Sequence, residues 1–142
     1  MGKCGIRIFE TGVIFLMGLP LALGIGPRVV KAQEEHQISI LVDQLAKVRS
    51  QVALYQAEHD GLMPGQFAYG EDVTAEGFIK AIEEDGSGFF PANPFMKDVM
   101  AKTLCCVNDI DAKPTGNEAA AWWFNAATGR FAACNSHYHA QY

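Results

Sequence analysis

The chain of 142 residues has room for one domain and a terminal extension, because a core much smaller than about 100 residues is hard to stabilise unaided. Its formal net charge is -5 and it contains no basic run, which argues against nucleic acid as a partner. Hydrophobic residues make up 49% of the chain, and much of this apolar weight lies before residue 31.

The first predicted element is an apolar helix near the N-terminus. From Thr11 to Gly26 there is no charged residue, and this stretch would span about 24 Å as a helix, against a hydrocarbon core of roughly 30 Å. A helix over residues 6–30 is long enough to cross a bilayer if Glu10 and Arg28 lie near the interfaces or are neutralised by partners. The pattern therefore predicts a transmembrane segment.

The residues around this segment resemble a known processing signal. Gly5 and Ile6 are followed by Glu10, then by the apolar segment, and then by Pro27. This arrangement resembles the class III leader of type IV pilins and type II secretion pseudopilins. The resemblance implies that a prepilin peptidase cuts between Gly5 and Ile6 and methylates the new N-terminus at Ile6. It also implies a helix kink at Pro27, where many members of the family carry a proline.

Glu10 lies inside an apolar stretch, where an unpaired carboxylate costs a few kcal/mol. Such a residue indicates a partner, and the resemblance implies that the partner is the free N-terminal amine of a neighbouring subunit. The alternative is that Glu10 lies solvated in the headgroup layer and has no role in assembly.

A conventional secretory signal is the other interpretation of the N-terminus. A basic start, an apolar middle and the residues Val30, Lys31 and Ala32 before Gln33 approximate a small-residue cleavage site. Cleavage there would release a soluble periplasmic binding module instead of a filament subunit.

The next element is an amphipathic helix from about Arg28 to His59. Its apolar residues recur at spacings of three and four, which places them on one face: Ile38, Leu41, Leu45, Val48, Val52 and Tyr55. Fewer than three heptads is marginal for a free coiled coil, so we expect this face to pack on the rest of the chain. Asp60 and Gly61 are suited to cap the helix.

The end of this helix carries a second resemblance. Tyr55, His59, Gly61 and Pro64 resemble the helix exit of type II secretion major pseudopilins. His59 could be a ligand or a base, but a single histidine at a helix end is more often a cap or a surface residue.

The remaining residues predict a small α+β head. Thr74 can cap a short helix with Phe78, Ile79 and Ile82 on its apolar face, and a proline-rich extended connection follows. The predicted strands cover residues 103–107, 121–125 and 130–134, with residues 126–129 as a hairpin turn. Trp122, Trp123 and Phe124 could form a ligand platform, but burial is the commoner role of such residues.

Three cysteines lie in the head, where export would bring them into an oxidising compartment. Adjacent residues of a strand point to opposite faces, so just one of Cys105 and Cys106 is expected to bridge to Cys134. The sequence leaves open which one. Such a disulfide could stabilise a small head by roughly 3 kcal/mol.

Two groups of residues have the character of metal ligands. Cys134, His137 and His139 have ligand-like spacing but lack a second cluster, so the indication of zinc, or of a zinc hydrolase, is weak. The loop before the last hairpin offers oxygen ligands for calcium, which the resemblance to type II pseudopilins implies there: Asn108, Asp109, Asp111, Asn117 and Glu118.

We therefore expect an α+β protein with a long kinked N-terminal helix, membrane-spanning in its first half, packed on a small head that contains a short helix and a small antiparallel sheet. Residues 1–5 would form the leader, 6–30 the filament-core helix, 31–60 its continuation and 61–142 the head.

The function that the resemblance implies is that of a structural subunit of a type IV pilus or a type II secretion pseudopilus. Its partners would be copies of itself in a helical filament, the inner membrane, the prepilin peptidase and the assembly machinery. Its place would be the inner membrane with a periplasmic head, or an extracellular filament after assembly. No nucleophile with a nearby base and an orienting group emerges from the sequence, so we expect no enzymatic activity.

Overall fold

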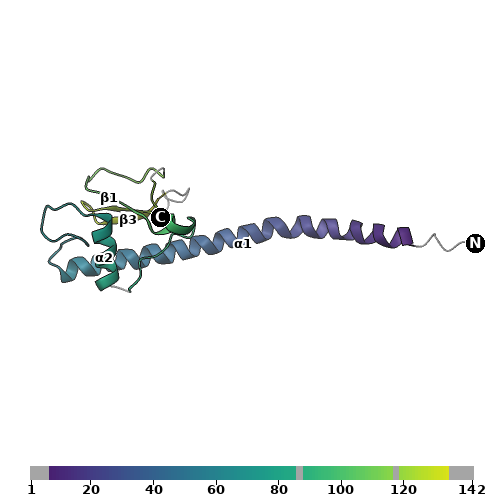
Figure 1. Cartoon of the computed structure of the whole chain (residues 1–142), viewed down its shortest axis with the longest axis horizontal. Helices are drawn as coiled ribbons and strands as arrows, with labels where there is room; N and C mark the ends of the chain where they lie inside the picture. The colour runs from purple at the N-terminus through teal and green to yellow at the C-terminus, as the bar shows by residue number, and fades with distance from the viewer. Residues whose placement is uncertain (1–6, 86–87, 117–118, 135–142) are drawn as a thin grey trace, which may run out of the picture. The chain divides into compact units, whose positions relative to one another are not determined.

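The structure is a computed structural model that describes residues 7–85, 88–116 and 119–134, with side chains from residue 29 onward except that of residue 98. The chain divides into two compact units, Met1–His36 and Gln37–Tyr142. The helix α1 runs over Arg7–Glu58 and contributes residues to both units. The second unit also contains the other helices and strands of the described residues (Figure 1).

The C-terminal part of α1 belongs to the core of the second unit. The predicted apolar face is confirmed there, because Leu41, Leu45, Val48 and Val52 are at most 2% exposed and pack on the sheet and α2. The helix ends as predicted at Asp60 and Gly61. Asp60 adopts φ 53°, and the N–H of Gly61 donates to the carbonyl of Gln56 at 2.7 Å, the hydrogen bond of a Schellman cap.

The short helix α2 covers Ala75–Asp85. Its start is confirmed, because the N–H of Gly77 donates to the hydroxyl oxygen of Thr74 at 3.1 Å, as an N-cap requires. Phe78 and Ile82 are buried and Ile79 is half-buried, so the predicted apolar face turns toward the core.

The three strands form one sheet in the order β1-β2-β3. Their bounds are Leu104–Val107, Trp122–Asn125 and Arg130–Ala133, close to those predicted. β2 and β3 form the predicted antiparallel hairpin. The expectation of a wholly antiparallel sheet is wrong, however, because β1 pairs with β2 in parallel. A parallel pair requires a connection that returns to the start of the sheet, and residues 108–121 supply it.

One element was not predicted. A 3-10 helix, η1, covers Asp98–Lys102 and leads directly into β1. It connects the proline-rich segment to the sheet, and the N–H of Asn93 donates to the carbonyl of Ala101 at 2.7 Å.

The sheet separates two apolar clusters. The larger lies between the sheet and the helices and includes Phe78, Phe90, Trp122, Phe124 and Phe131. The smaller lies on the opposite face and contains Trp123, Ala132 and Cys134, with Cys105, Val107 and Ala112 packed against it. The prediction that the aromatic run Trp122, Trp123 and Phe124 is core is confirmed, because all three are at most 2% exposed.

Candidate functional site

The residues predicted to direct processing and assembly lie at the start of the chain. Gly5 and Ile6 are outside the described residues, whereas Glu10 and Pro27 fall within α1 but their side chains are not described. Within the described part of the chain, no helix is both long and apolar enough to cross a bilayer. Cleavage at Gly5, the pairing of Glu10 and the kink at Pro27 all stay predictions.

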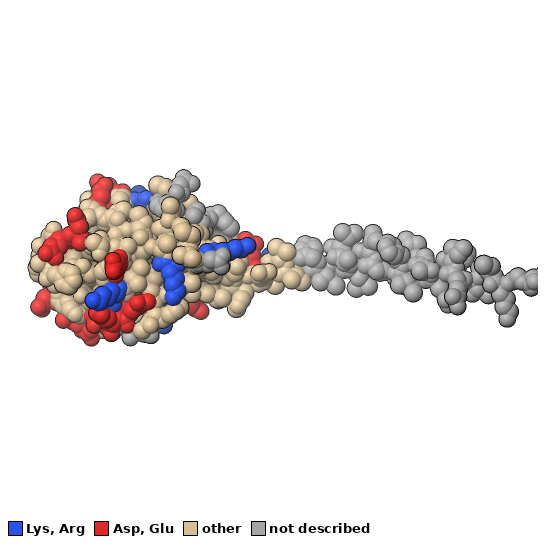
Figure 2. All heavy atoms as spheres, viewed as in Figure 1, with Lys and Arg blue, Asp and Glu red and all other residues tan. Residues whose placement is uncertain are grey.

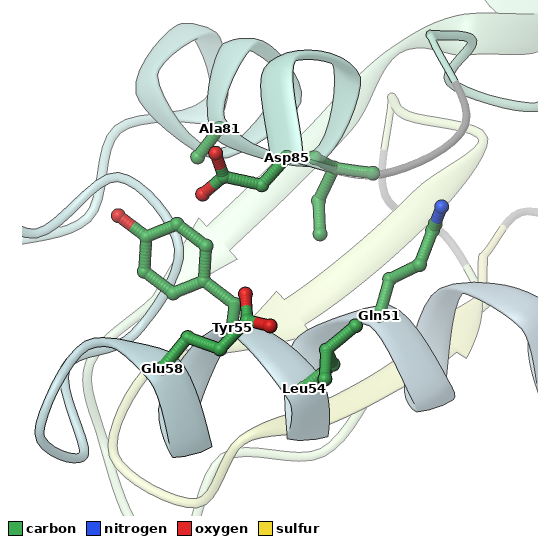
Figure 3. Close-up of a pocket in the computed structure, with 7 residues that line it drawn as sticks. Gln51, Leu54, Tyr55, Glu58, Ala81 and Asp85 are labelled. Carbon is green, nitrogen blue, oxygen red and sulfur yellow. The ribbon is translucent and has the colours of Figure 1, made fainter.

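The end of α1 meets the end of α2 at a small pocket of about 20 Å³ (Figure 3). Tyr55 and Glu58 from α1 and Ala81 and Asp85 from α2 point into this space from opposite sides. Burial and the carboxylate of Asp85 raise the pKa of the Tyr55 hydroxyl above its usual value, although a backbone hydrogen bond from Gly65 partly opposes the shift. The Tyr55 hydroxyl is therefore neutral near pH 7, as an ordinary tyrosine is.

His59 lies beside this pocket and makes three contacts. Its ring stacks on that of Tyr55 with centroids 3.8 Å apart, and its Nδ1 lies 2.9 Å from the carbonyl oxygen of Tyr55. Its Nε2 lies 3.5 Å from a carboxylate oxygen of Asp85. The helix-end role predicted for His59 agrees with these contacts, since each of them joins the last turn of α1 to itself or to α2.

The cysteines are distributed over both faces of the sheet. Cys106 packs against the larger cluster and Cys105 against the smaller one, so the prediction that they point to opposite faces is confirmed. Cys134 belongs to the smaller cluster and therefore shares the face of Cys105. Burial, and secondarily Cys105, raise the pKa of the Cys106 thiol to about 12, which makes its thiolate rare at neutral pH.

The structure contains no disulfide between Cys134 and either strand cysteine, and the predicted bridge stays a prediction. The strand order separates these residues. β2 lies between β1 and the end of β3, and two strand spacings amount to about 10 Å, whereas bridged cysteines have Cα atoms within about 7 Å. Formation of the bridge would require the two edge strands to approach each other.

The predicted calcium ligands lie in the loop after β1. Asn108 donates its amide to a carboxylate oxygen of Asp72 at 3.0 Å, and a carboxylate oxygen of Asp109 accepts the N–H of Asp111 at 3.0 Å. Across the described residues, no three side chains of His, Cys, Asp or Glu come together in a group that could hold a metal. Asn117 and Glu118, like His137 and His139 of the weak zinc indication, are outside those residues. Calcium stays a prediction for this loop.

Two buried asparagines, which the sequence did not single out, position the connections of the head. Asn125 is 1% exposed and donates its side-chain amide to the carbonyl of Asp109 at 2.7 Å, while its Oδ1 accepts the N–H of Ala127. Asn93, equally buried, donates to the carbonyl of Ala121 at 2.9 Å. The sequence offers a signal for each of them, because Asn125 is a polar residue within a predicted strand and Asn93 lies beside a proline. The carbonyls to which their side chains donate, however, are distant in the chain.

Arg49 does not belong to the predicted apolar face of its helix. In the structure its Nε donates to the carbonyl of Phe131 at 3.0 Å, so α1 contacts the outer edge of β3. Burial and the charge of Arg130 lower the pKa of Arg49, which still stays cationic at any ordinary pH.

Comparison of the chain with protein-family models, with curated proteins and with solved structures gives no match.

Proposed function

We propose that this chain is a structural subunit of a pilin-like filament, anchored in the inner membrane by the segment before residue 31 until it is assembled. The observation that supports this most is the change in burial along α1. Residues 41–52 contribute four buried apolar side chains to the core, whereas every residue from 29 to 36 is exposed. Val29 is 57% and Val30 is 66% exposed, and they follow Arg28 and the uncharged stretch from Thr11 to Gly26.

Exposed valines on a helix favour burial in an apolar environment other than the core of the head. For a subunit that waits in the membrane, the environment is lipid. For an assembled subunit, it is the same segment of neighbouring copies, which would pack as the core of the filament. The folded head, whose own core is complete without these residues, would lie outside.

Glu10 would set the register of that packing. After cleavage, the amine of Ile6 carries a positive charge, and the carboxylate of Glu10 in a neighbouring copy would pair with it. A charged side chain costs about 3 kcal/mol at the centre of a membrane helix and less toward its ends, so an unpaired Glu10 carries part of this cost and subunits are favoured to associate where the pair can form. The helix exit at Tyr55, His59, Gly61 and Pro64 favours the type II secretion pseudopilus, whose filament moves folded proteins, over a surface pilus.

The mature N-terminus is the first test. We expect mass spectrometry of the protein purified from membranes to find a chain that begins at a methylated Ile6. A chain that begins at Gln33 would instead identify a released periplasmic module, and it would refute the proposal.

The second test replaces Glu10. Glu10→Gln keeps the size of the side chain but removes its charge, so we expect filament incorporation to fall at least tenfold in a cross-linking or shearing assay. Glu35→Gln is the matched control, because it removes an exposed carboxylate from the same helix downstream of the apolar segment. Equal incorporation of the two variants would contradict the role of Glu10, and membrane levels of both variants should match wild type.

A further inference from the structure

The two edges of the sheet differ. The outer edge of β3 is contacted by α1, whose Arg49 donates to the carbonyl of Phe131. β1 is the other edge strand, and it pairs only with β2 among the described strands. An uncovered strand edge offers backbone donors and acceptors to another extended chain.

Hydrogen bonds to β2 define which groups of β1 face outward. The carbonyl of Thr103 accepts the N–H of Trp122 at 3.0 Å, and the carbonyl of Val107 accepts the N–H of Ala126 at 2.9 Å. Because backbone groups alternate along a strand, those of Leu104 and Cys106 face away from β2. No residue of the described chain provides them with a hydrogen-bond partner on that side.

A groove runs beside this edge, between α2 and the start of β1. Its apolar lining comes from Ala75, Ile79 and Leu104. Its polar lining comes from Glu76, Lys80, Glu83, Lys102 and Thr103. Glu83, also in the groove, already accepts the N–H of Phe90 at 3.2 Å. The lining therefore suits alternate apolar side chains of an extended peptide, since such side chains project from one face of a strand every second residue.

Charge differs between the two ends of β1. Lys102 precedes the strand, with its Nζ 3.7 Å above the ring centroid of Phe89, whereas Asp72, bonded to Asn108, and Asp109 lie where the strand ends. On the face seen in Figure 2, acidic side chains gather at the left end of the head and most basic ones lie to their right. A peptide antiparallel to β1 would match this polarity with a basic residue first and an acidic residue last.

We propose that the β1 edge and this groove bind an extended segment of another protein by strand addition, with a basic residue at its start, apolar residues at alternate positions and an acidic residue at its end. The backbone N–H and C=O groups of Leu104 and Cys106 provide the main-chain hydrogen bonds. Ala75, Ile79 and Leu104 receive the apolar side chains, and Lys102 pairs with the terminal acid. This binding is independent of filament assembly.

The test uses the full-length chain in detergent micelles and a capped hexapeptide, Lys-Val-Thr-Val-Thr-Glu. We expect the peptide to slow amide exchange of Leu104 and Cys106 at least tenfold. A peptide methylated on the backbone nitrogens that face β1 should bind at least tenfold more weakly, because it keeps the side chains but loses the strand hydrogen bonds. The charge-reversed peptide, with Glu first and Lys last, should bind at least threefold more weakly.

Lys102→Glu tests the polarity without removing a buried group. It should abolish the preference between the two charged peptides, because each of them then has one favourable and one unfavourable end. Lys47→Glu, the same charge change at an exposed residue of α1, should leave the preference unaltered. Equal binding of the methylated peptide would overturn strand addition. Slow amide exchange at Leu104 and Cys106 in the absence of peptide would also overturn the proposal. If that slow exchange depended on protein concentration, a second copy would occupy the edge; otherwise the chain itself would occupy it.

Discussion

The two faces of the sheet are covered in different ways. The face toward the helices is packed by α1, α2 and Phe90 of the proline-rich segment, and the ring centroids of Phe78 and Phe124 lie 4.3 Å apart there. On the opposite face, Ala112 of the irregular segment 108–116 packs against the cluster that contains Trp123. When a core side chain is truncated, a face packed by helices relaxes little and keeps a cavity. A face covered by a loop can relax further and fill part of the space.

The largest expected effect comes from truncating the helix-backed core. Phe124→Ala should lower the free energy of unfolding by about 4 kcal/mol, because its neighbours Phe78 and Phe131 are fixed on a helix and a strand. Trp123→Ala removes more atoms but should cost about 3 kcal/mol, because the loop above it can move inward. Urea unfolding followed by circular dichroism gives both values, and a larger loss for Trp123→Ala would show that the loop-covered face is the more rigid one.

An intermediate effect is expected at the buried asparagines. Asn125→Ala leaves the carbonyl of Asp109 and the N–H of Ala127 without their side-chain partner, which should cost about 2 kcal/mol. Asn93→Ala should cost a similar amount, since it breaks a comparable buried hydrogen bond to Ala121.

The location of the loosened segment distinguishes these two variants. Amide exchange of residues 109–112 should accelerate in Asn125→Ala and stay unchanged in Asn93→Ala. If both variants loosened the same residues, Asn125 would not be the anchor of the covering loop.

The smallest effect concerns the titration of Cys106 on the helix-backed face. Its pKa is about 12 in the folded chain against an ordinary value of 9.0, so the folded state favours the neutral thiol. This contribution to stability is fully present below pH 9 and is lost as the pH rises from 9 toward 12. Between pH 8 and 10.5 the wild type should therefore lose more stability than Cys106→Ala.

Labelling provides a check on the same residue. At pH 8, iodoacetamide should modify Cys106 at least tenfold more slowly in the folded chain than in urea, because the thiolate is the reactive form. Equal rates in the two states would mean that the side chain is solvated and would exclude burial as the cause of the raised pKa.

The sequence by itself determined the elements whose evidence is local. Spacings of three and four defined the buried face of α1, Thr74 marked the start of α2, and the turn at residues 126–129 defined the hairpin. Alternation along a strand also placed Cys105 and Cys106 on opposite faces. Each of these follows from the geometry of a few consecutive residues.

Only the tertiary structure decided what depends on residues far apart in the chain. Four residues of β1 could pair in either direction, and the return of residues 108–121 makes the pairing with β2 parallel. The same topology puts Cys134 on the face of Cys105 with β2 between them, and it leaves β1 as an edge strand that pairs only with β2 among the described strands. Strand direction and order are set by the packing of the whole head, because a strand's own side-chain pattern is the same for a parallel and an antiparallel neighbour.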